Sequence, residues 1–229
     1  MPKVLRLRTI VARYFNITNE KANLIIGRGS VRVDGKVDSP ASKIENWQAI
    51  SVDDKIIRSA IVFSYIKFYK PIGIECTLNS KIDNNLLTVF KYPQKLFPVG
   101  RLDKDSEGLL LMTDDGRIFN QVAISERHKE KEYLVTLDRY YDNVFLENMS
   151  NGIVIMGKLT RSCKLIAVTE KSFRIILTQG MNRQIRRMCY KLGYQVLELI
   201  RIRIVNVELG DLKVGTWKEL TIAERLGLS

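Results

Sequence analysis

The first quarter of the chain carries hydrophobic residues at helical spacing. Within residues 5–15, positions i, i+3, i+4 and i+7 of one helix face are Leu7, Ile10, Val11 and Tyr14. A second face follows a break at residues 16–18 and consists of Ala22, Ile25 and Ile26. Thr18 is suited to cap that helix and Gly27 to end it, because glycine readily adopts the positive φ found at helix ends. The pattern predicts two short helices.

A segment of alternating character follows the helix pair. Val31 and Val33 flank Arg32, and Asp34-Gly35 is the dipeptide that suits a type I′ hairpin turn. We expect this small β-ribbon to continue to about residue 55. A unit of fewer than 60 residues buries little surface on its own. Residues 1–60 are therefore predicted to form a small accessory domain.

The rest of the chain, residues 61–229, is predicted to be a larger domain built mainly from strands. Segments rich in Ile, Val, Tyr and Phe are typical of strands and occur at 62–69, 131–137, 152–156, 163–168, 172–178, 195–201 and 203–209. A solid apolar run at 109–112 predicts a buried strand. One helix is expected at 182–192, where the apolar positions are Ile185, Met188, Cys189 and Leu192 and Gly193 follows. Strands in runs predict an α+β fold with a mixed, mostly antiparallel sheet.

The charge balance points to a polyanionic partner. Lysine and arginine total 37 against 25 aspartate and glutamate residues, so the net charge is +12. Six cations decorate the predicted helix pair and ribbon: Arg6, Arg8, Arg13, Lys21, Arg28 and Arg32. No apolar run exceeds four residues, whereas a membrane span needs about 20. We expect no membrane partner, no secretory signal and a cytoplasmic location.

Cysteine and histidine usage argues against a metal site. The three cysteines are far apart, cannot all pair and form no C-x-x-C, and His128 is the one histidine. We expect no metal, no cofactor and no disulfide framework. His128 is expected on the surface or in a loop.

The densest chemical signal is residues 100–116, GRLDKDSEGLLLMTDDG. A calcium loop is one interpretation, because acids and glycine follow an EF-hand-like spacing at Asp103, Asp105, Glu107, Gly108 and Asp114. That interpretation requires flanking helices, but prolines precede the segment and an apolar strand follows it. The alternative is a reactive carboxylate, because the cations Arg101 and Lys104 would keep Asp103 ionised as a nucleophile or base.

The predicted helix at 182–192 has a cationic face. Arg183, Arg186 and Arg187 recur at i, i+3 and i+4, on the side opposite Ile185. Either this face contacts a nucleic acid or it is merely solvated, which is the commoner outcome for a run of charges.

Four segments, in this order, resemble the RsuA-like RNA pseudouridine synthases. They are Lys70–Gly73 (K-P-x-G), residues 100–116 (G-R-L-D-x-x-[ST]-x-G-L-L-x-x-T-x-D-G), Lys131–Tyr133 (K-x-Y) and the basic helix segment NRQIRRM at 182–188. Residues 5–36 are similar to the S4 RNA-binding domain. Asn182 and Ser106 depart from the commoner His and Thr, which favours the subgroup that acts on large-subunit ribosomal RNA.

The resemblance implies a catalytic set and an RNA-binding set. Asp103 would be the nucleophile, Arg186 would pair with it, and Tyr133 would stack on a flipped-out uracil and assist proton removal. The RNA-binding set would be Arg101, Leu102, Lys104, Arg183, Gln184, Ile185 and Arg187, with Ile185 packing beneath the base. Base flipping costs a few kcal/mol, which phosphate contacts would supply. The implied activity is an isomerase that forms pseudouridine in RNA without a cofactor.

Several alternatives stay open at this stage. The chain would also suit a non-catalytic S4-type protein that binds or assembles ribosomes, and less well a DNA-binding regulator. Transfer RNA is a possible substrate beside ribosomal RNA, either free or in an assembling particle. Periodicity alone favours Tyr133 as an inward-packed strand residue. Lys70 has either a structural or a functional role.

Overall fold

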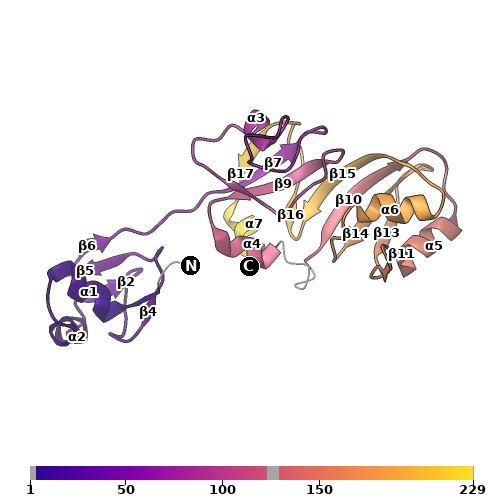
Figure 1. Cartoon of the computed structure of the whole chain (residues 1–229). Helices are drawn as coiled ribbons and strands as arrows, with labels where there is room; N and C mark the ends of the chain where they lie inside the picture. The colour runs from indigo at the N-terminus through magenta and orange to yellow at the C-terminus, as the bar shows by residue number, and fades with distance from the viewer. Residues whose placement is uncertain (1–3, 123–128, 229) are drawn as a thin grey trace. The chain divides into compact units, whose positions relative to one another are not determined.

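The computed structural model describes residues 4–122 and 129–228, and it forms two compact units, residues 1–63 and 64–229 (Figure 1). His128 lies outside the described residues. In the described part of the chain, no helix combines the length and the apolar character that crossing a membrane requires. The α+β architecture with a mostly antiparallel sheet is as predicted.

The first unit packs two helices against short strands. Its elements are β1 (Leu5–Arg6), α1 (Leu7–Phe15), α2 (Asn19–Gly27), β2 (Val31–Val33), β3 (Lys36–Val37), β4 (Lys43–Ile44), β5 (Ile50–Val52) and β6 (Lys55–Arg58). The strands form a sheet in the order β3-β2-β5-β6 and a separate β1-β4 pair. Leu7, Val11 and Ala22 are fully buried in the core between helices and strands.

Local sequence signals in this unit are largely confirmed. The hydroxyl oxygen of Thr18 accepts a hydrogen bond from the Lys21 amide at 3.4 Å, and Asp34 and Gly35 have φ of 48° and 81°, as a type I′ turn requires. Two details were wrong. Tyr14 is 47% exposed, and the inward face of α1 consists of Leu7, Val11 and Ala12. The α2 helix ends at Gly27 as predicted, but the residue with positive φ is Gly29 and not Gly27.

The second unit is built on one large sheet. Its strands are β7 (Tyr65–Lys70), β8 (Phe97–Val99), β9 (Glu107–Thr113), β10 (Lys131–Leu137), β13 (Lys164–Ala167), β14 (Ser172–Leu177), β15 (Val196–Ile204), β16 (Val207–Glu208) and β17 (Trp217–Glu219). The order is β13-β14-β10-β15-β9-β7-β17, with β16 on β15 and β8 on β9. Among the described strands, β9 and β15 form the one parallel pair. A separate hairpin joins β11 (Val154–Ile155) to β12 (Lys158–Leu159).

Helices cover the two ends of this sheet. They are α3 (Leu86–Val89), α4 (Gly116–Val122), α5 (Asn143–Asn151), α6 (Gln184–Lys191) and α7 (Ile222–Gly227). In Figure 1, α5 and α6 lie beside β10, β13 and β14, and they share one hydrophobic core with β10 and β14. The α6 helix was predicted. The α5 helix was missed, although Asp142 caps it by accepting a hydrogen bond from the Phe145 amide at 2.8 Å.

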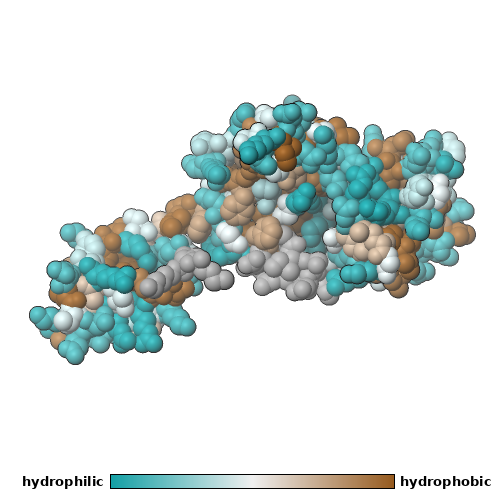
Figure 2. Space-filling view, in the orientation of Figure 1, coloured by the Kyte–Doolittle hydropathy of each residue, from teal (hydrophilic) through white to brown (hydrophobic). Residues whose placement is uncertain are grey.

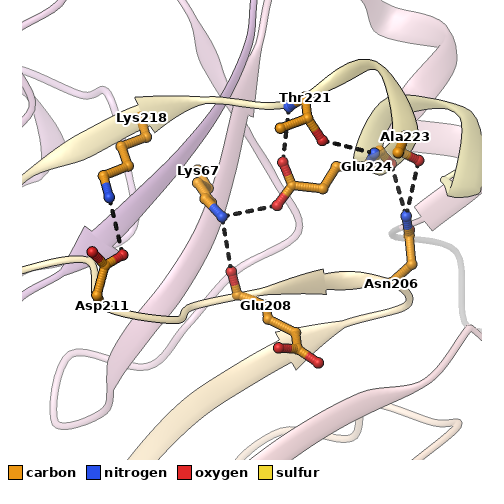
Figure 3. A network of polar contacts seen from close by, with 8 residues as sticks. All are labelled: Lys67, Asn206, Glu208, Asp211, Lys218, Thr221, Ala223 and Glu224. Atoms are coloured by element: carbon orange, nitrogen blue, oxygen red, sulfur yellow. Dashed lines mark hydrogen bonds and ion pairs between the residues drawn. The ribbon is translucent and has the colours of Figure 1, made fainter.

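The α7 helix is fastened to the sheet by a polar network (Figure 3). Lys67 donates to the Glu224 carboxylate at 2.8 Å and to the Glu208 carbonyl at 3.2 Å. Thr221 and Glu224 form a reciprocal capping box at the start of the helix. Asn206 donates to two carbonyls of the helix, at 3.2 Å each. This network joins β7, β16 and α7.

The β9 strand is buried on both faces. Leu109 and Leu111 pack into the core that includes α4, whereas Leu110 and Met112 pack into the core that includes Leu86 of α3. This double burial explains the unbroken apolar run of the sequence.

One predicted strand break was wrong. We expected separate strands at 195–201 and 203–209, but β15 runs unbroken to Ile204. Glu132 pairs with Arg203 and Tyr133 pairs with Arg201, so Ile202 is an extra residue, a β-bulge, within the ladder. The turn comes at residues 205–206 instead, where Val205 has φ 53°.

Candidate active site

A cavity of about 720 Å³ brings together most of the predicted site residues. Its walls come from the loop between β8 and β9, from β10, from the start of α6 and from β15. The predicted residues that line it are Arg101, Leu102, Asp103, Tyr133, Arg183, Gln184 and Ile185. Lys104, Arg186 and Arg187 were also predicted, and they do not line this cavity.

The loop that carries Asp103 is held by backbone hydrogen bonds. Its chain enters through Gly100, at φ 77°, and the Ser106 amide donates to the Asp103 carbonyl at 3.1 Å. The Gly73 amide donates to the Lys104 carbonyl at 2.7 Å. The segment Lys70–Gly73 is thus hydrogen-bonded to the Asp103 loop and helps to fix its position.

Lys70 shapes that supporting segment. Its side chain is fully buried, and its ammonium group donates to the carbonyls of Pro71 and Ile74 at 2.8 and 2.9 Å. Burial lowers the pKa of Lys70 to about 8. These contacts favour a structural role, because Lys70 is not part of the cavity lining.

Asp105, which the sequence suggested only as a calcium ligand, anchors the loop to the start of α6. Both of its carboxylate oxygens accept hydrogen bonds from Arg183, at 2.8 and 2.6 Å. These bonds from Arg183 hold the pKa of Asp105 below its usual value, with a further contribution from the charge of Arg186. The ionised carboxylate is therefore favoured at neutral pH.

Arg186 also contacts Asp105, mainly through its backbone carbonyl. Its guanidinium donates to the backbone carbonyls of Asp105 and Val196 at 2.6 and 2.7 Å. We expected Arg186 to pair with Asp103. In the described part of the chain its guanidinium instead forms an ion pair with the Asp105 carboxylate, at 3.5 Å. Arg186 therefore holds the loop two residues beyond Asp103.

Arg183 occupies a strained position at the start of α6. It has φ 50° and ψ 35°, the left-handed region that costs a non-glycine residue energy. Its two hydrogen bonds to Asp105 help to offset that cost. The side chain is thereby directed at the Asp103 loop.

Lys104 and Arg187 are exposed outside the main cavity. Arg187 donates to the carbonyl and side-chain oxygens of Asn182, at 3.0 and 3.1 Å. It also lines a second hollow of about 410 Å³, together with Met156, Tyr190 and Lys191. Hydrophilic surface near α6 lies beside apolar surface near the β11–β12 hairpin in Figure 2. Cationic and apolar side chains thus lie together in this second hollow.

Tyr133 combines the two roles that the sequence left open. It is half-buried against the core that α6 and β14 share, and it also lines the cavity. Its ring is therefore available to a molecule in the cavity while the strand keeps it in place.

Arg201 was missed by sequence analysis. It is 2% exposed, and it donates to the Leu109 carbonyl at 2.7 Å and to the Arg101 carbonyl at 3.2 Å. It thus joins β15 to β9 and to the Asp103 loop. Its inward position in the β15 alternation, two residues after buried Leu199, was the available signal.

Gly108 allows this close approach of β9 and β15. It has φ +103°, and an added Cβ would lie 2.4 Å from the Arg201 carbonyl oxygen. A side chain would therefore be excluded both by sterics and by backbone conformation.

A family model described as RNA pseudouridylate synthase matches residues 64–191. The dual-specificity RNA pseudouridine synthase RluF of Escherichia coli (strain K12) is 35% identical over 226 residues, which cover 98% of this chain and 78% of that protein. The chain belongs to the RNA pseudouridylate synthase family. It is an enzyme of the RluF-like, RsuA-related type.

Two further relatives agree with this family assignment. The ribosomal small subunit pseudouridine synthase A of Pasteurella multocida is 29% identical, over 96% of this chain and 97% of that protein. A solved structure described as a pseudouridylate synthase has a TM-score of 0.69 and 29% identity, over 98% of this chain and all of that one. The similarity to these pseudouridine synthases therefore extends over nearly the whole chain, including the first unit.

Among the described residues, no cluster of three or more His, Cys, Asp or Glu has the arrangement of a metal site. The cavity offers a carboxylate, an aromatic ring and several cations, and its volume is that of pockets for small organic groups. A single nucleotide base is of suitable size for it.

Proposed function

We propose that this pseudouridine synthase isomerises uridine in ribosomal RNA, most favourably of the large subunit, and in transfer RNA as a second substrate. One observation carries the proposal: Asp103 lines an organic-sized cavity together with Tyr133, on a loop that α6 holds through Asp105. The dual specificity named for the RluF relative supports two RNA classes. A cytoplasmic location follows from such substrates.

Asp103 is the proposed nucleophile, with Tyr133 stacked on a flipped-out uracil. Ile185 is 4% exposed and lines the same cavity, so it would pack beneath the base. Arg183 and Arg186 are positioning residues, because they hold Asp105 and thereby the loop that presents Asp103. The base leaves its stack at a cost of a few kcal/mol, which contacts with phosphates offset.

Those phosphate contacts come from two surfaces. The first unit, residues 1–63, is proposed to be an S4-like RNA-binding domain, supported by its exposed Arg6, Arg13 and Lys21. In the second unit, Arg101, Lys104 and Arg187 are exposed around the site, and Leu102 and Gln184 complete its lining.

A non-catalytic ribosome-binding protein is the alternative function. Such a protein needs exposed cations but has no need of a carboxylate on a braced loop in a cavity. Family membership and the cavity geometry both favour the enzyme.

The decisive experiment compares wild type with Asp103→Asn on total ribosomal and transfer RNA from cells that lack the enzyme, with pseudouridine mapped by carbodiimide-stop sequencing. We expect new sites with wild type, and none with the variant at unchanged RNA affinity. Asp211→Asn is the control, because it removes an equal charge at an 88% exposed side chain. Turnover by Asp103→Asn near the wild-type rate would remove Asp103 from the nucleophile role.

A further inference from the structure

Lys131 is a cation of the cavity, and within residues 4–122 and 129–228 it is held only by long hydrogen bonds. Lys131 lines the cavity and lies on β10 two residues before Tyr133, so both side chains project from the same face of the strand. Its ammonium group makes two long contacts, with the carbonyls of Val122 and Lys129 at 3.5 and 3.4 Å. No ion pair of Lys131 is formed within the described part of the chain.

The other charged groups near Lys131 are mostly engaged elsewhere. Its chain neighbours Glu130 and Glu132 are paired with Arg203 and Arg174. Asp103 and Arg183 line other walls of the cavity, and the buried Arg201 lies on the adjacent strand β15. Lys131 and Arg201 together therefore make the wall formed by β10 and β15 electropositive.

This environment disfavours the charge on Lys131. Burial, and to a smaller extent the positive charge of Arg201, lowers the pKa of Lys131 to about 8. A half-buried ammonium group with long hydrogen bonds and a cationic neighbour gains most from an anion that enters the cavity. The wall is thus suited to bind negative charge.

The reaction creates such a charge on the base, whichever atom Asp103 attacks. If Asp103 attacks the sugar, the bond from C1′ to N1 breaks and its electron pair leaves with uracil as an anion. If Asp103 adds to C6 of the ring, the electron pair moves through C5 to O4 as an enolate. In either route the bond from N1 to C1′ breaks, the base turns and the bond from C5 to C1′ forms. The bond to Asp103 breaks and returns its electron pair to the carboxylate, C5 loses a proton and N1 gains one. The isomerisation is therefore balanced without another reactant.

We propose that Lys131 is a catalytic residue that stabilises the negative charge on the uracil oxygens during this exchange of bonds. Arg201 is a positioning residue. Its hydrogen bonds to the carbonyls of Leu109 and Arg101 hold β15 against β9 and against the Asp103 loop. This role rests on the proposed function. It assigns to the K-x-Y lysine a contact with the reacting base.

The first test separates binding from chemistry. Lys131→Met and Lys131→Arg are compared with wild type by single-turnover conversion of a saturating RNA substrate and by filter binding of the same RNA. We expect Lys131→Met to lower the rate constant by about 100- to 1,000-fold and to change RNA affinity by less than about three-fold, as for loss of one phosphate contact at most. Lys131→Arg keeps the charge and should recover at least a tenth of the rate. Lys158→Met, at an exposed site on β12, is the control.

A substrate with 5-fluorouridine at the target position tests the charge itself. Fluorine withdraws electrons and stabilises the base anion, so less help from the protein is needed. We expect the loss caused by Lys131→Met, measured as consumption of the target nucleotide, to be at least ten-fold smaller with 5-fluorouridine. Equal losses on both substrates would overturn the proposal, because a merely structural defect acts on both alike.

The pH profile supplies an independent readout. Because the pKa of Lys131 is lowered to about 8, its protonated fraction falls as pH rises through that value. The wild-type single-turnover rate should therefore fall above pH 8, whereas Lys131→Arg should keep its rate to higher pH, since arginine stays charged. Identical alkaline limbs for the two proteins would count against the role.

The outcomes distinguish this proposal from the proposed function. A wild type that converts no uridine in ribosomal RNA, transfer RNA or immature ribosomal particles overturns both. An active wild type whose Lys131→Met variant is equally fast removes the role of Lys131 alone. A variant that loses only RNA affinity shows that Lys131 contacts a phosphate, which also overturns the proposal.

Discussion

The two units use their cations in different ways. In the described part of residues 1–63 no ion pair is formed, and Arg6, Arg13, Lys21, Arg28 and Arg32 are exposed. In residues 64–229 several arginines are held by carboxylates, including Arg183 by Asp105 and Arg203 by Glu130 and Glu132. Free cations are available to phosphates, whereas paired cations fix the positions of loops and strands. We therefore expect the first unit to set RNA affinity and the ion pairs of the second to set the rate.

Removing the ion pair between Asp105 and Arg183 is the strongest test of this difference between the two units. Asp105→Asn should lower the single-turnover rate by about 10- to 100-fold, because a small misplacement of the Asp103 loop is costly for catalysis. RNA affinity should stay equal or rise, because the variant loses one negative charge and its net charge becomes more positive by one. A variant that loses affinity and keeps its rate would break the comparison. Asp211→Asn, at an exposed pair with Lys218, is the matched control.

The dependence of activity and stability on acidic pH also tests the pair of Asp105 and Arg183. The pKa of Asp105 is lowered by its hydrogen bonds with Arg183, so the pair contributes stability above the ordinary aspartate pKa of 3.8 and loses it as pH falls through the lower folded value. Circular dichroism and activity measured down to pH 4 should therefore show an intact loop anchor in wild type. A loss of activity near pH 6 that Asp105→Asn abolishes would contradict this expectation.

Neutralising cations of the first unit should have an intermediate effect. Arg13→Gln with Lys21→Gln should weaken RNA binding by about ten-fold at moderate salt. If both side chains contact phosphates, the slope of log affinity against log salt should fall by about 1.4 to 1.8. The rate at saturating RNA should not change. Lys81→Gln with Lys95→Gln, at exposed sites of the second unit, tests whether any two lost charges would do the same. Equal effects of the two double variants would mean that the first unit does not bind RNA specifically through Arg13 and Lys21.

The network at α7 should have the smallest effect on activity (Figure 3). Burial alone would raise the pKa of Glu224, but hydrogen bonds from Lys67 and Thr221 lower it below its usual value. Glu224→Gln should therefore lower the free energy of unfolding by about 1–2 kcal/mol, measured by urea titration, with less than a two-fold change in rate. Lys218→Gln, at an exposed ion pair, should change neither. A large loss of rate in Glu224→Gln would mean that this ion pair also positions the site.

Local patterns predicted α1, α2, α6 and the longer strands, whereas α3, α4, α5 and α7 were not predicted. The spacing in residues 5–15 and 182–192 led to α1 and α6, and Asp34-Gly35 led to a type I′ turn. The errors arose where neighbours along the chain do not decide the outcome. The bulge at Ile202 looks like a strand end in sequence, because only its pairing with β10 shows that the ladder continues.

The site was predicted in part, for a related reason. Asp103 and Tyr133 stand in motifs that resemble a known family, and both line the cavity. Asp105 and Arg201 have no motif of their own in that comparison. Their importance comes from partners far away in the chain, such as the bond from Arg183 to Asp105 across 78 positions.

The sequence by itself determined the α+β class, the periodic elements, the net charge of +12 and the family resemblance, because each depends on composition or on residues a few positions apart. Only the tertiary structure decided which cations are paired and which are free. It also decided that Arg186 contacts Asp105 and that Lys131 shares a cavity with Asp103. The parallel pairing of β9 with β15, which Gly108 permits, brings these distant segments together. Side chains so far apart in sequence acquire their electrostatic environment only when the sheet has formed.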